Sequence, residues 1–119
     1  MADQFRIHVN GSPQQALQQL EQTLQPEGFR ITWEQEGQQG FLERGTRLKA
    51  LLLGVIATHY KYRLIVHPQA DGTVVLDIGL GNTGLSGGAL GVAKVRKRLG
   101  TVRDQLIAAY QANGVLIGA

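Results

Sequence analysis

The sequence contains no cysteine and no long hydrophobic run. Without cysteine the chain forms no disulfide and cannot bind zinc or an iron–sulfur cluster through thiolates. The longest nearly charge-free apolar stretch, Ala50 to Ala57, is far shorter than the roughly 20 residues that cross a bilayer. The segment Met1 to Gln4 has neither the basic start nor the apolar run of a secretory signal. These absences exclude a transmembrane helix from the sequence and lead us to expect a cytoplasmic protein.

With 119 residues, of which 43% are hydrophobic, the chain is expected to form one domain, 1–119, around one core. Its charges are divided unevenly. Residues 1–46 contain three arginines and six acidic residues, whereas residues 47–119 contain nine lysines or arginines and three acidic residues. A basic half attracts phosphate, nucleic acid or anionic lipid, but it also serves ordinary solubility.

Periodicity predicts four elements in the first part of the chain. Apolar and polar residues alternate from Phe5 to Val9, which is typical of a strand with one buried face. The sequence of Ser12 to Gln15 has the hydroxyl, proline and glutamine of a helix-capping box, and leucines follow at helical spacing up to Leu24. A second strand is predicted from Phe29 to Glu34, with its hairpin partner from Phe41 to Arg44.

The second part is predicted to contain a clear hairpin and a long helix. Alternation over Tyr60 to Val66 and Thr73 to Leu80 indicates the two strands of the hairpin. Ser86 is a candidate cap for a helix whose apolar residues recur every three or four positions from Val92 to about Ala112. The apolar segment from Arg47 to Ala57 fits either a strand or a short helix, because periodicity does not separate the two.

The predicted order is a strand, a helix, four or five strands and a long helix. It indicates an α+β fold, in which a short N-terminal helix and a long C-terminal helix pack on an antiparallel sheet. This order resembles the helix-grip arrangement of the Bet v 1/START-like superfamily and its TATA-binding-protein-like relatives. The resemblance implies that a small apolar molecule or lipid is held between the sheet and the C-terminal helix. A ferredoxin-like arrangement is the rival fold.

Four residues are candidates for lining such a ligand site: Trp33, Tyr60, Tyr62 and Asp77. The aromatic residues equally fit a role in the core. Asp77 fits an exposed strand face, and if it is buried in a cavity it can bind a polar group. No paired acid, nucleophile or histidine motif accompanies these residues, so the sequence predicts no catalytic residue, metal or cofactor.

The predicted long helix carries four candidate anion-binding residues: Lys94, Arg96, Lys97 and Arg98. They follow a glycine-rich segment, Gly79 to Gly91, that matches neither a P-loop nor a dinucleotide fingerprint. Its glycines are better explained by a sharp turn and close packing. Two charge-free apolar segments, Leu51 to Ala57 and Leu85 to Val92, fit core packing, a ligand mouth, a membrane contact or an oligomer interface.

Three hypotheses for function follow from these patterns. The first is a non-enzymatic binding domain for a small apolar molecule or lipid. The second is a basic module that binds nucleic acid or an anionic membrane through the predicted long helix. The third is a structural domain that assembles with identical copies. A cyclase-like enzyme needs polar groups that converge in a cavity, and the sequence identifies none.

Overall fold

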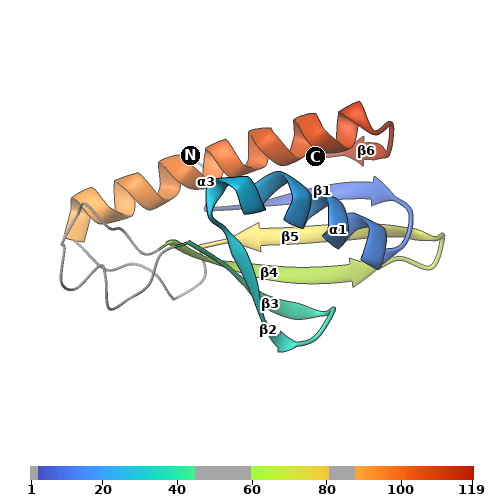
Figure 1. Ribbon diagram of the computed structural model, residues 1–119, viewed down its shortest axis with the longest axis horizontal. Coiled ribbons are helices and arrows are strands. Elements are labelled where there is room, and N and C mark those ends of the chain that lie inside the picture. Colours follow the sequence, from blue (N-terminus) through green and yellow to red (C-terminus); the bar gives the residue numbers. More distant parts are fainter. Residues whose placement is uncertain (1–2, 45–59, 81–87) are drawn as a thin grey trace.

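The computed structural model describes residues 3–44, 60–80 and 88–119, and side chains in the last range from Ala93 onward. It has an α+β fold (Figure 1). In the described ranges, six strands form one antiparallel sheet in the order β2-β3-β4-β5-β1-β6. The strands are β1 (Gln4–Asn10), β2 (Arg30–Gln35), β3 (Gln39–Arg44), β4 (Tyr60–Pro68), β5 (Thr73–Gly79) and β6 (Leu116–Gly118). The helices are α1 (Pro13–Leu24), the 3-10 turn η1 (Gln25–Glu27) and α3 (Gly88–Ala112).

The capping box predicted for α1 is confirmed. The backbone N–H of Gln15 donates to the hydroxyl of Ser12 at 3.2 Å, and the backbone N–H of Ser12 donates to the amide oxygen of Gln15 at 3.1 Å. The helix buries Ala16, Leu20 and Leu24, which are four residues apart and so lie on one face. The chain then leaves the helix through η1 and Gly28, whose φ of +88° favours glycine.

Alternation along the strands directs one face of the sheet toward the helices. In β5, for example, Val74, Leu76 and Ile78 are buried, whereas the residues between them are half-buried. Both predicted hairpins, β2–β3 and β4–β5, are present. The buried side chains of the strands lie on this one face, which therefore contains most of the sheet's share of the core. Each fully buried aliphatic side chain contributes about 1.5–3 kcal/mol to folding.

The long helix α3 lies across the sheet and next to α1 (Figure 1). Buried residues recur along it at spacings of three and four: Val95, Leu99, Val102, Leu106 and Tyr110. Two tyrosine hydroxyls fix its position, because Tyr62 donates to the carbonyl of Val95 at 2.7 Å and Tyr110 donates to the carbonyl of Ala16 at 2.6 Å. In the described ranges, none of the helices is apolar enough over sufficient length to span a membrane.

The sequence did not predict β6, which pairs with β1 after the end of α3. The backbone N–H of Asn10 also donates to the carbonyl of Val115 at 2.8 Å, just before β6 begins. A strand of three residues is too short to produce a recognisable alternation. The segment from Arg47 to Ala57, most of the glycine-rich stretch and the candidate cap Ser86 lie outside the described residues.

We expect opposite effects on stability from two glycine-to-alanine substitutions. A Cβ atom on Gly40 would lie 2.5 Å from the carbonyl oxygen of Thr32 and 3.0 Å from the indole ring of Trp33. Gly40→Ala is therefore expected to lower the free energy of unfolding by about 1–3 kcal/mol. Gly100 lies inside α3 with no atom within 4 Å of an added Cβ, so Gly100→Ala is expected to raise it by up to about 1 kcal/mol. Urea unfolding measures both changes, and an unchanged Gly40→Ala midpoint would contradict the close β2–β3 packing.

Candidate ligand groove

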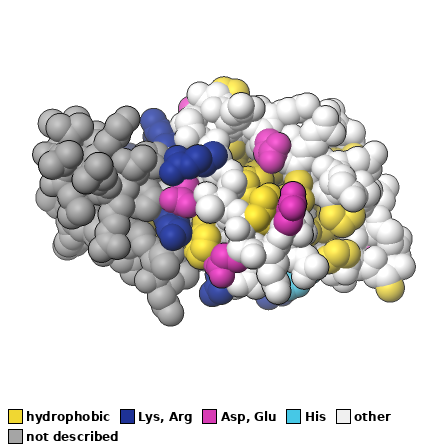
Figure 2. Space-filling view, turned by 60° about the horizontal axis from the view of Figure 1, so that its bottom comes forward, with side chains coloured by type: hydrophobic (Ala, Val, Ile, Leu, Met, Phe, Trp, Pro, Cys, Tyr) yellow, Lys and Arg dark blue, Asp and Glu magenta, His cyan; other side chains and the backbone are white. Residues whose placement is uncertain are grey.

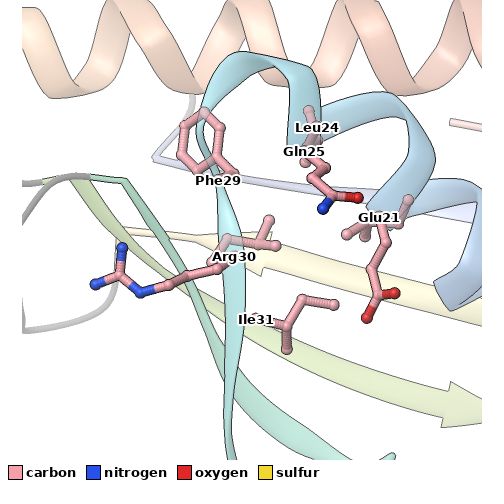
Figure 3. A pocket seen from close by; sticks show the side chains of 8 residues that line it. Glu21, Leu24, Gln25, Phe29, Arg30 and Ile31 are labelled. Atoms are coloured by element: carbon pink, nitrogen blue, oxygen red, sulfur yellow. The ribbon is translucent and has the colours of Figure 1, made fainter.

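A groove of about 260 Å³ lies between α1 and β2 (Figure 3). Its lining is apolar underneath and polar at the rim. The apolar residues are Leu20, Leu24, Phe29, Ile31 and Leu42, and the rim residues are Glu21, Gln25 and Arg30. The five apolar residues come from α1, β2, β3 and the connection between α1 and β2, so the fold itself brings them together.

The groove exists because α1 covers β2 only in part. In Figure 1, β2 and β3 extend away from the two helices at one edge of the sheet. As a result Ile31 and Trp33, which point to the helix side of β2, are half-buried, unlike the equivalent residues of β4 and β5. Among the apolar lining residues, Ile31 contributes most of the exposed surface, because the other four are at most 4% exposed.

The charged side chains at the rim lie at opposite ends of the groove. Figure 3 shows Glu21 extending downward from α1, while Arg30 extends in another direction, away from Ile31. Both are exposed, and Arg30 forms an ion pair with Glu43 in which the nitrogen and oxygen are 3.6 Å apart. Neither charge is therefore buried among the apolar residues, and the floor suits an uncharged, apolar group.

Phe29 joins the groove to an aromatic cluster in the core. Its ring centroid lies 6.4 Å from that of Tyr60 and 6.1 Å from that of Tyr62. Tyr62 is fully buried, and burial raises the pKa of its hydroxyl far above the ordinary value. The neutral hydroxyl donates to the carbonyl of Val95, so the aromatic cluster connects the sheet to α3 next to Phe29.

The predicted ligand residues separate into three locations. Tyr60 and Tyr62 lie in this aromatic cluster, behind Phe29. Trp33 lies on β2 against the core and over Gly40, beyond the residues that line the groove. Asp77 alternates with buried residues of β5, and its carboxylate is 3.2 Å from Arg6 on the neighbouring strand β1. Asp77 therefore lies on the face of the sheet opposite the helices and the groove.

The four predicted anion-binding residues differ in their surroundings. Lys94, Arg96 and Lys97 are exposed, and Arg96 forms an ion pair with Asp3 at 2.9 Å. Arg98 is half-buried, and its guanidinium carbon lies 5.8 Å from the centroid of the Tyr60 ring. The structure thus brings together one predicted cation and one predicted aromatic residue.

A second hollow, of about 210 Å³, lies between the ends of β1 and α3 and the start of α1. Its lining consists of Val9, Asn10, Gln15, Ala16, Gln19, Tyr110, Asn113 and Val115. The amide groups there already bond within the protein, because Asn113 donates to Gln19 and Gln15 bonds with Ser12. The apolar groove beside β2 is therefore the stronger candidate for a ligand site.

Among the residues whose placement is described, no three acidic or histidine side chains gather closely enough to hold a metal ion. No protein-family model matches the chain, and no curated protein matches its sequence. The geometry and chemistry of the groove are therefore the basis for a functional proposal.

Proposed function

We propose that this chain is a non-enzymatic binding domain whose α1–β2 groove holds a small apolar molecule or the apolar part of a lipid. One observation carries the proposal: five apolar side chains line a groove with a polar rim. Pockets for drug-sized ligands have volumes of roughly 300–1,000 Å³. At about 260 Å³ the groove suits a smaller molecule or one short alkyl chain.

The expected driving force is removal of apolar surface from water. Each methylene group that a ligand buries contributes up to about 0.8 kcal/mol. Part of this gain offsets the loss of translational and rotational freedom. A short alkyl ligand is therefore expected to bind with a dissociation constant roughly between micromolar and millimolar.

The sheet topology supports the proposed likeness to helix-grip proteins. β1 pairs with β5, the last strand before α3, and the long helix then crosses the sheet. The proposed ligand position differs from the one that this likeness implies. In the described ranges, the space between the sheet and α3 is occupied by buried side chains, such as Tyr62, Leu99 and Val102. Because a shared fold does not define a function, the groove carries the proposal and the topology only supports it.

The proposal is tested by native mass spectrometry of the protein purified from its own cells, followed by a calorimetric titration with octanol. The expected results are a stoichiometric apolar molecule, or an empty protein that binds one octanol. A protein that carries no small molecule and binds no octanol would contradict the proposal. The same spectrum gives the oligomeric state, and thereby tests the alternative that identical copies assemble.

A further inference from the structure

Two arginines from distant parts of the chain meet at one tyrosine ring. Arg44 is the last residue of β3 and lies directly opposite Tyr60 in the register of β3 and β4. Arg98 lies on α3, beside the buried residues Val95 and Leu99. Each guanidinium carbon is 5.8 Å from the centroid of the Tyr60 ring, which is within the range of a cation–π contact.

This arginine pair, Arg44 and Arg98, lacks a carboxylate in the part of the chain that the structure describes. Of the five other described arginines, the exposed Arg63 also has no carboxylate close by, whereas four have one between 2.9 and 3.6 Å away: Arg6, Arg30, Arg96 and Arg103. Both arginines of the pair are half-buried, so water screens their charges less than those of an exposed side chain. An anion that binds to these guanidinium groups would neutralise charge that no carboxylate of the described residues neutralises.

Surface charge agrees with this position. Figure 2 shows Lys and Arg side chains gathered toward one end of the described surface, with acidic side chains both among them and farther along among hydrophobic ones. In Figure 1, β3 ends and α3 begins at this same end of the molecule. An anionic ligand is therefore attracted to the end at which the arginine pair lies.

The arginine pair adjoins one end of the groove. The side chain of Arg44 passes beside Gly28, where an added Cβ atom would lie 3.5 Å from its Nε atom. The next residue, Phe29, lines the groove, and its ring packs against that of Tyr60. Glu21, which repels anions, extends from the α1 side of the groove (Figure 3). The groove thus has a cationic end near Phe29 and an acidic rim residue on α1.

We infer that the natural ligand is amphipathic and anionic, with its apolar part in the groove and a carboxylate or phosphate on Arg44 and Arg98. This inference rests on the proposed function of the groove. Guanidinium groups that stack on an aromatic ring keep the N–H groups at their edges available. These planar donors match the two oxygens of a carboxylate or phosphate, and such charge-assisted hydrogen bonds are stronger than neutral ones.

The test compares octanol with octanoate and octyl phosphate, which have the same alkyl chain, by calorimetry at neutral pH. The wild-type protein is expected to bind at least one of the two anions about tenfold more tightly than octanol, as charge-assisted hydrogen bonds predict. In the double variant Arg44→Gln/Arg98→Gln this preference is expected to disappear, while octanol binds as before. Each single variant is expected to lose part of the preference, and these variants serve if the double variant does not fold.

The matched control is Arg6→Gln/Arg63→Gln, which removes the same charge from two exposed residues of β1 and β4 on the face of the sheet opposite the helices. It is expected to keep the preference for the anion. Inorganic phosphate, titrated alone, separates a free anion from a lipid headgroup, because a headgroup site requires the alkyl chain for tight binding. Equal binding of octanol and both anions, or an equal loss in the control, would overturn the inference. Anion binding without octanol binding would instead contradict the groove and keep the arginine site, and no binding of any probe would overturn both.

Discussion

Replacing Tyr62 with alanine is expected to lower the free energy of unfolding by about 3–5 kcal/mol. Tyr62 is fully buried, its ring packs with Phe29 and Tyr60, and its hydroxyl donates to α3. The substitution leaves a cavity between the sheet and the long helix and removes the donor for the carbonyl of Val95. Because small domains are stable by only about 5–15 kcal/mol in total, this change removes a large part of the stability.

Tyr62→Phe separates the hydroxyl from the ring. It keeps the packing and removes one buried hydrogen bond, so a loss of about 1 kcal/mol is expected. Urea unfolding of both variants against the wild type measures the two contributions. If Tyr62→Ala lowers the free energy of unfolding no more than Tyr62→Phe does, packing of the Tyr62 ring does not hold α3 to the sheet.

The substitution Ile31→Gln is expected to weaken octanol binding by at least about fivefold. Ile31 is half-buried, so a glutamine amide in the free protein remains in contact with water. A bound alkyl chain would remove that water, and burial of an unpaired amide costs about 1–3 kcal/mol. The loss is therefore expected in the affinity for octanol, with a smaller effect on folding.

Ile65→Gln is the matched control for this substitution. Ile65 is also a half-buried strand isoleucine, but it alternates with the buried residues of β4 and so lies on the opposite face of the sheet. Calorimetric titration of both variants with octanol is expected to show weaker binding only for Ile31→Gln. Equal affinities in the two variants would mean that octanol binds elsewhere.

Most elements of this fold were predictable because their signals are local. The capping box at Ser12 starts α1, and the alternation within β4 and β5 defines the hairpin. The buried positions of α3 follow the predicted helical spacing from Val95 to Tyr110. The strand β6 was not predictable in the same way, because its three residues depend on pairing with β1.

The candidate site depends instead on long-range geometry. The sequence predicted Tyr60, Tyr62 and Arg98 as candidates, but it contained no reason to place Arg98 over the Tyr60 ring. Arg44 was missed because a charge at the end of a strand is ordinary, and its contact with Tyr60 follows from the β3–β4 register.

The groove was missed for a related reason. Ile31 and Leu42 have the alternation of ordinary core residues, and they pair directly across β2 and β3. What makes them part of a groove is that α1 covers this edge of the sheet only in part. That coverage depends on the packing of helix against sheet, which the alternation of apolar residues within β2 and β3 does not describe.

Methyl-resolved NMR during an octanol titration tests the ligand groove most directly. We predict saturable shifts of the groove methyl groups of Leu20, Leu24, Ile31 and Leu42. Methyl groups of Ile65 on the opposite face of the sheet are predicted to stay unchanged. Shifts that are confined to the opposite face, or groove methyl groups that do not respond at saturating octanol, would contradict the proposal that this groove binds an apolar ligand.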